Sequence, residues 1–216
     1  MIPARHTWFH VRFFRFYADF RIRKNFSSVT VHNDVPEVHE KPLVVIANHF
    51  SWWDGFFILW LNHRYFRKLF HVMMLEDQLQ GNMILNKTGA FSIKKSSRDM
   101  VESLNYARGI LERPTQMSPL LLMYPQGEIQ SMHTRPLKFE KGLEHITRGL
   151  ENKINILMVA VLVDYFSDQK PQLHFYLELY PFIKQLDMKA VEDAYNLFFS
   201  DSINHHILAS SHQPIL

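Results

Sequence analysis

A histidine and an aspartate lie between two apolar stretches of the chain. His49 and Asp54 belong to the segment NHFSWWDG, residues 48–55, which follows PLVVIA and precedes FFILWL. A carboxylate that accepts a hydrogen bond from imidazole Nδ1 fixes the tautomer, so that Nε2 can take a proton from a hydroxyl or an amine. The pair therefore offers general-base chemistry.

The same segment also has a purely structural interpretation. Ser51 and Asp54 have the S-x-x-D spacing of a capping box, in which side chains satisfy free backbone N–H groups in the first turn of a helix. Ser51 is a rival nucleophile, but it lacks the G-x-S-x-G context of a nucleophile elbow and fits the cap better. From this segment alone, catalysis and capping both stay open.

A second polar cluster, GAFSIKKSSRD, covers residues 89–99 and contains Lys94, Lys95 and Arg98. These cations are expected near the N-terminus of a helix, where they oppose the macrodipole at a cost of a few tenths of a kcal/mol each. The arrangement makes sense if an anion such as phosphate binds there. The alternative is that the three long side chains simply extend into water.

A third polar segment, MYPQGEIQS, covers residues 123–131. Pro125 and Gly127 turn the chain sharply after an apolar strand, and glycine lets a ligand approach the backbone. Gln126 and Glu128 place polar groups at the carboxyl end of that strand. Taken alone, the segment is an ordinary loop.

Apolar runs alternate with helical patterns along the chain. The predicted strands are 43–47, 71–75, 89–93, 119–124, 156–165 and 173–180, and the predicted helices are 51–65, 99–112, 143–150 and 187–199. This order predicts an α/β fold with a mixed, mostly parallel central sheet flanked by helices. The alternating strand 173–180 is expected toward an edge. All three polar segments follow strand ends, where ligand sites of such folds gather.

Composition limits the possible classes of protein. The 216 residues, 47% of them hydrophobic, suffice for one domain with a sizeable core. Absence of cysteine excludes disulfides, thiolate metal sites and a thiol nucleophile. The apolar stretch 154–163 is about half the length needed to span a bilayer, and no secretory signal is expected at the N-terminus. His205 and His206 are adjacent but form no convincing metal site, so we expect none.

Residues 1–30 differ from the rest and are expected to form an interfacial helical segment, with residues 31–216 as a single α/β domain. The first 25 residues hold six basic residues and one acidic residue. One helical stripe collects four aromatic residues, Phe9, Phe13, Phe16 and Phe20. Rings and arginines together are typical of a helix lying in a membrane interface. The alternatives are a helix docked on the protein's own core, with arginine stems spread over it, and a weakly supported RNA-binding helix.

In this order, the three polar segments resemble the motifs of the glycerolipid acyltransferase family, which acylates glycerol phosphate and lysophosphatidic acid. The first motif, N-H-x-S-x-x-D, is matched in full by Asn48, His49, Ser51 and Asp54. The second motif, a glycine followed by apolar residues and then a basic residue, resembles residues 89–95. The third, F-P-E-G, resembles 124–127, and a downstream F-K-K-G element and an apolar block resemble 139–142 and 156–163. The resemblance covers roughly residues 40–180 and implies that His49 is the catalytic base, oriented by Asp54.

The departures from the family pattern concern the acceptor. Family members hold it with the third motif's glutamate and the second motif's arginine, which here become Gln126 and Lys95. Glu128 and Ile129 replace a common Thr-Arg pair. Lysine supplies a point charge where arginine supplies a bidentate fork. An acceptor other than glycerol 3-phosphate or lysophosphatidic acid is therefore expected, such as another lysophospholipid, an amino-acid lipid or a pigment-linked hydroxyl.

The sequence therefore predicts a membrane-associated acyltransferase, peripheral or monotopic, on the cytoplasmic face and without nucleic acid. The acceptor is expected to attack the thioester of acyl-CoA or acyl-carrier protein directly, with no bound cofactor. The expected substrate-binding residues are Asn48, Ser51, Lys94, Lys95, Arg98, Gln126, Gly127 and Glu128. Aromatic side chains of helix 51–65 are expected either to line an acyl groove or to pack in the core. Two alternatives stay open: a non-catalytic lipid-binding module of the same fold, and a hydrolase or thioesterase that uses Ser51.

Overall fold

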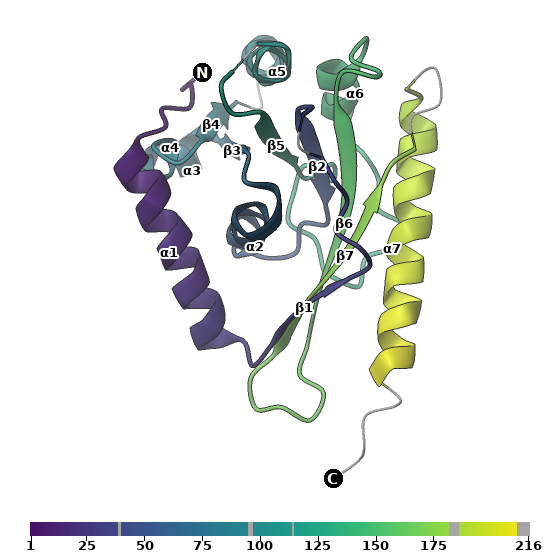
Figure 1. Ribbon diagram of the computed structural model, residues 1–216. Coiled ribbons are helices and arrows are strands. Elements are labelled where there is room, and N and C mark those ends of the chain that lie inside the picture. The colour runs from purple at the N-terminus through teal and green to yellow at the C-terminus, as the bar shows by residue number, and fades with distance from the viewer. Residues whose placement is uncertain (39, 95–96, 114, 182–185, 211–216) are drawn as a thin grey trace.

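The computed structural model describes residues 1–38, 40–94, 97–113, 115–181 and 186–210 (Figure 1). Its centre is a seven-stranded sheet with the strand order β1-β7-β6-β2-β5-β3-β4. The strands are β1 (Val29–His32), β2 (Leu43–Ala47), β3 (Leu69–Leu75), β4 (Ala90–Ile93), β5 (Pro119–Met123), β6 (Asn155–Asp164) and β7 (Gln172–Leu179). All neighbouring strands are parallel except β6 and β7. The predicted α/β fold with a mostly parallel sheet is confirmed.

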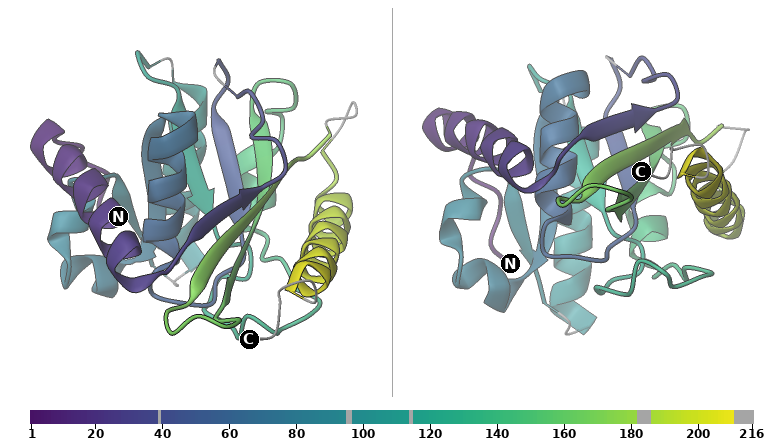
Figure 2. Two further views of the ribbon diagram at one scale, coloured as in Figure 1. Left: turned by 60° about the horizontal axis from the view of Figure 1, so that its bottom comes forward. Right: turned by 90° about the horizontal axis from the view of Figure 1, so that it is seen from below.

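Helices cover both faces of this sheet, and α1 and α7 lie on opposite sides of the molecule (Figure 2). The helices are α1 (Trp8–Asn25), α2 (Asp54–Leu61) with a π-helical turn η1 (Asn62–Phe66), α3 (Glu76–Gln80), α4 (Met83–Asn86), α5 (Ser97–Glu112), α6 (Gly142–Thr147) and α7 (Met188–Ser210). Side chains of α1 and α2 share one hydrophobic core with the sheet, and those of α5, α6 and α7 share the other.

The central strand β2 shows why the sheet needs both layers. Its five residues, LVVIA, are all fully buried. Val44 and Ile46 point into the core under α5, α6 and α7, and Val45 points into the core under α1 and α2. Because successive side chains of a strand face opposite sides, an unbroken apolar run is stable only between two layers. The strand that carries His49 at its end is therefore rigidly held.

Strand β7 lies toward an edge of the sheet, as expected, but the edge position itself is taken by β1, an unpredicted strand that pairs with it in parallel. The alternation in β7 resembles a solvent-facing pattern, but its polar side chains His174 and Tyr176 are buried, and both contact His206 of α7. Helix α7 also continues to Ser210, past its predicted end at Phe199.

The first 30 residues are closely joined to the rest of the protein. The segment before α1 follows the β4 side of the sheet, where Ser92 N–H donates to Ile2 O at 2.9 Å and Arg5 N–H donates to Asn86 O at 3.0 Å. Helix α1 buries Phe14, Ala18 and Ile22 in the core that it shares with α2. The predicted boundary at residue 30 falls inside β1.

Candidate active site

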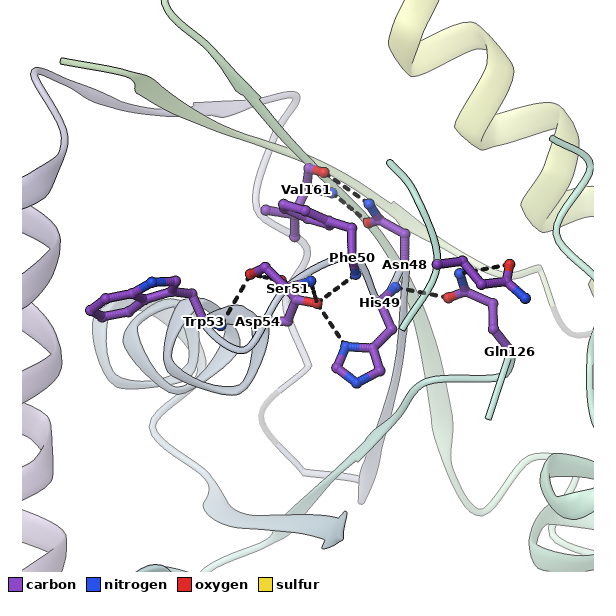
Figure 3. A network of polar contacts seen from close by, with 9 residues as sticks. Asn48, His49, Phe50, Ser51, Trp53, Asp54, Gln126 and Val161 are labelled. Carbon is purple, nitrogen blue, oxygen red and sulfur yellow. Dashed lines mark hydrogen bonds and ion pairs between the residues drawn. The ribbon is translucent and has the colours of Figure 1, made fainter. Parts of the chain in front are cut away.

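Asn48 determines how the chain leaves β2. Its side-chain amide donates to Val161 O at 2.9 Å and accepts from Val161 N–H at 2.8 Å (Figure 3). The side chain thus supplies the same two groups as a backbone residue and extends the pairing of β2 with β6 by one position. The main chain is free to turn outward directly before His49. Asn48, predicted to bind substrate, is only 2% exposed and has this supporting contact.

His49 and Asp54 are brought together as predicted. Asp54 begins α2, and its Oδ2 lies 2.7 Å from His49 Nδ1. The Asp54 side chain has no exposure, whereas the His49 side chain is 22% exposed. With the Nδ1 proton donated to this carboxylate, Nε2 keeps its lone pair. Figure 3 shows Nε2 on the side of the ring away from Asp54. This arrangement suits a general base.

Asp54 also makes the contacts expected from the capping interpretation. Its Oδ2 accepts the N–H groups of Phe50 and Ser51 at 2.7 and 2.9 Å, and its Oδ1 accepts the Ser51 hydroxyl at 2.8 Å. The Ser51 hydroxyl accepts in turn from Trp53 N–H at 3.0 Å. Since Ser51 donates to Asp54 and not to the imidazole, it lacks the direct histidine partner of a triad-type serine nucleophile.

The loop after β5 holds His49 from the other side. The ring of Tyr124 stacks on the imidazole, with centroids 4.1 Å apart and planes inclined by 13°. Gln126 Oε1 accepts from His49 N–H at 2.8 Å, and Gln130 N–H donates to His49 O at 2.9 Å. Gly127 makes the tight turn between them with a φ of +71°, a left-handed conformation that favours glycine.

Tyr124 and Gln130 are functional candidates that the sequence prediction missed. Both belong to the segment MYPQGEIQS, but nothing local shows that they contact a residue about 80 positions earlier. Burial and the nearby charge of Asp54 raise the pKa of Tyr124 well above its usual value, so this hydroxyl stays neutral. Its oxygen is buried and has no hydrogen-bond partner among the described residues.

The predicted phosphate-binding cations have mixed outcomes. Lys94 Nζ lies 3.2 Å from Glu76 Oε1 and 3.9 Å from Asp99 Oδ2, and the hydrogen bond to Glu76 is the main cause of its raised pKa. Its charge is therefore largely compensated within the protein. Lys95 and the side chain of Arg98 lie outside the described residues. Glu128, in the third segment, is exposed and accepts from Gln130 at 3.2 Å.

The aromatic residues of the predicted acyl-binding helix pack mainly into the core. Phe57 is 1% exposed, and Phe56 and Trp60 are also buried. Trp53 lies under the Arg21 guanidinium, 4.6 Å from its ring centroid. Only Trp52 projects into solvent to a large extent, with 63% exposure. Core packing thus accounts for most of this cluster.

The segment that contains these motifs matches a known protein family. A family model described as Acyltransferase matches residues 28–163. The chain belongs to the acyltransferase family. The match spans β1 to most of β6 and includes both His49 and Asp54. Comparison with curated proteins gives no match.

Three chains of solved structures also match this acyltransferase. One is the 1-acyl-sn-glycerophosphate acyltransferase PlsC from Thermotoga maritima, with 12% sequence identity and a TM-score of 0.56. The alignment covers 90% of this chain and 79% of that chain. At this identity, the likeness shows a common fold only. Searching the described residues finds no helix with the length and apolar character to cross a membrane, and no group of side chains arranged to hold a metal ion.

Proposed function

We propose that this acyltransferase moves a fatty acyl group from acyl-CoA or acyl-carrier protein to a hydroxyl or an amine of a lysophospholipid-like acceptor, in phospholipid or other lipid biosynthesis. The observation that carries this proposal is the 2.7 Å contact between His49 Nδ1 and Asp54 Oδ2, with the imidazole partly exposed. Membership of the family supports the class of reaction.

In the proposed reaction, His49 Nε2 takes the proton of the acceptor hydroxyl as its oxygen attacks the thioester carbonyl carbon. The tetrahedral intermediate then collapses, the carbon–sulfur bond breaks, and the imidazolium returns its proton to the leaving thiolate. Asp54 keeps the ring in place and stabilises its transient positive charge. The products are the acylated acceptor and a free thiol, without a covalent acyl-enzyme.

We also propose that α1 attaches the protein peripherally or monotopically to the cytoplasmic face of a membrane. Both sequence interpretations of this helix apply, each to a different face. One face is docked on α2, and the other exposes rings at Trp8, Phe9, Phe13, Phe16 and Phe20, each 46–77% accessible. Exposed aromatic rings interleaved with arginines favour the boundary between lipid headgroups and acyl chains. Arg21 of α1 contacts the ring of Trp53, so α1 adjoins the segment that carries His49.

The function can be tested with purified protein, acyl-CoA and a panel of lysolipids, measuring thiol release and lipid products by mass spectrometry. We expect acceptor-dependent release of thiol together with a new acyl-lipid. His49→Ala is expected to lower the rate at least about 1,000-fold. Gln172→Ala is a control outside the site, since this side chain bonds Asp168 in the β6–β7 connection.

The same assay separates the two alternatives. A hydrolase that uses Ser51 predicts thiol release without any acceptor and its complete loss in Ser51→Ala. A non-catalytic lipid-binding module predicts lipid binding without thiol release from any pairing of donor and acceptor. Either result would contradict the proposed transfer reaction.

A further inference from the structure

We propose that Gln126 is a positioning residue, which holds the backbone of His49 in place and does not bind the acceptor. The proposal rests on the proposed function only in taking His49 as the base. It gives the third sequence motif a role different from the one expected from the family pattern.

The contacts of Gln126 are directed at the backbone of His49. Its Oε1 accepts from His49 N–H at 2.8 Å, and its Nε2 lies 3.5 Å from Gln130 Oε1. Gln130 in turn donates its own N–H to His49 O at 2.9 Å. Figure 3 shows Gln126 bonded to the backbone of His49, on the side of His49 opposite to Asp54. Both backbone polar groups of His49 are therefore bonded to one loop.

His49 needs such support because of where it lies in the chain. It comes after the end of β2 and before the start of α2, so neither the ladder nor the helix supplies partners for its backbone. Asp54 holds the ring only at Nδ1. Without a fixed backbone, the imidazole could pivot about that one contact and move Nε2. Together with Gln126, the Gln130 N–H and the stacked Tyr124 ring, Asp54 holds the base at four separate points.

The burial of Gln126 argues against contact with the acceptor. Its exposure is 5%, and its carbonyl oxygen is already used by His49 N–H. A ligand that took this oxygen would leave a buried backbone N–H without a partner, which is unfavourable. Glu128, which is exposed on the same loop, is better placed to meet a headgroup.

Two substitutions of Gln126 distinguish its effect on the position of His49 from the effect of charge near the imidazole. Gln126→Ala removes the acceptor for His49 N–H. Misplacement of a reacting group by about 1 Å can cost about 100-fold in rate, so we expect kcat to fall about 100-fold while the KM for the acyl acceptor changes less than about threefold.

Gln126→Glu introduces the residue usual in the family. It restores a hydrogen-bond acceptor for His49 N–H but adds a negative charge near the imidazole. We expect kcat within about tenfold of the original protein, with the acidic limb of the pH–rate profile moved to higher pH, because a nearby carboxylate favours the protonated ring.

The inference is overturned if Gln126→Ala leaves kcat unchanged, or if it raises the acceptor KM about tenfold or more at nearly constant kcat. Gln126→Met, which keeps the volume and lacks the acceptor, replaces the alanine variant if that one does not fold. A second readout is the downfield NMR signal of the His49 Nδ1 proton, which should broaden or vanish in the alanine and methionine variants. Gln172→Ala should leave it unchanged.

The proton signal keeps the two proposals distinguishable. Activity retained by His49→Ala would contradict the proposed function, while loss of the signal in Gln126→Ala would still support positioning. Conversely, an inactive His49→Ala beside a fully active Gln126→Ala would overturn only the positioning role.

Discussion

At the scale of single residues, Asp54 combines its proposed catalytic role with a structural one. It accepts the His49 ring proton, two backbone N–H groups and the Ser51 hydroxyl, and it is completely buried. His49 contributes less to the fold, because its side chain is partly exposed. Activity and stability should therefore respond differently to the loss of each residue.

We predict that Asp54→Ala lowers the free energy of unfolding by about 2 kcal/mol or more, because it leaves the half-buried donors of Phe50 and Ser51, directly before α2, without their acceptor. His49→Ala should change it by less than about 1 kcal/mol. Both variants should lose transfer activity. Urea denaturation followed by circular dichroism measures the difference, and equal losses of stability would contradict the dual role of Asp54.

The contact between His49 and Asp54 was predictable because the two residues are five positions apart and belong to one complete motif. The contact between Gln126 and His49 depends on β2 and β5 lying side by side in parallel, so that their carboxyl ends meet. No local pattern in the sequence reveals that contact. For Lys94, in contrast, a local pattern suggested an anion site, but the side chain is paired within the protein. Its main partner is Glu76 of α3, a short helix that the sequence analysis did not predict.

At the scale of elements, α1 has two apolar faces in different surroundings. One face is buried through Phe14, Ala18 and Ile22, and the other is exposed. Its sequence therefore shows no simple separation into one apolar and one polar side. That property explains why packing on the core and contact with a membrane were both reasonable expectations.

We predict that replacing exposed rings of α1 weakens binding to vesicles that contain anionic phosphatidylglycerol. Phe16 and Phe20 are 73% and 50% exposed, and burial of each ring in lipid is worth about 2 kcal/mol. The double variant Phe16→Ser, Phe20→Ser should bind at least about tenfold more weakly in a flotation assay, with an unchanged fold. Leu197→Ser with Leu208→Ser is the matched control, because these residues are similarly exposed on α7. Equal binding by both double variants would contradict the role of α1.

The interface between α7 and β7 should be sensitive to acid. His174 lies between His32 and His206, with Asp164 next to His206. Burial lowers the pKa of His174 from 6.5 to about 4. Because the folded pKa of His174 is below the unfolded value, the stability that this neutral imidazole contributes is fully present above pH 6.5. That contribution is lost as the pH falls towards 4.

From this shift, we predict that the free energy of unfolding falls by about 2 kcal/mol between pH 7 and pH 5 through His174 alone. His174→Leu cannot take up a proton, so its stability should decline less over the same range. Urea titrations at both pH values test this expectation. The same decline in both proteins would contradict a role for His174.

At the scale of the whole molecule, the N-terminal segment and the central sheet form one unit. The segment before α1 bonds to Ser92 and Asn86, α1 covers α2, and β1 is the edge strand next to β7. Continuous apolar runs such as β2 made the sheet predictable from the sequence. β1 was not predicted, because its four half-buried residues carry too little pattern.

We predict that removal of residues 1–25 impairs folding and does more than abolish membrane binding. The truncation uncovers the face of α2 that packs against Phe14 and Ile22, whose burial is worth about 2 kcal/mol each. For a chain of this size, the melting temperature should fall by about 10 °C, or the protein should aggregate. Circular dichroism and size-exclusion chromatography provide the measurement. A soluble, active monomer with unchanged melting temperature would show that the segment is a separable anchor.

The paired contacts of Asn48 with Val161 have a consequence for protein design. Val161 presents one donor and one acceptor, so the residue opposite must offer one of each, and the amide of Asn48 offers them on two separate atoms, as a backbone peptide group does. Aspartate has the same shape but cannot donate when ionised, and leucine can do neither. To place a proton acceptor at the carboxyl edge of another parallel sheet, a designer should therefore end the strand that carries it with asparagine. The residues that perform the chemistry can be chosen afterwards.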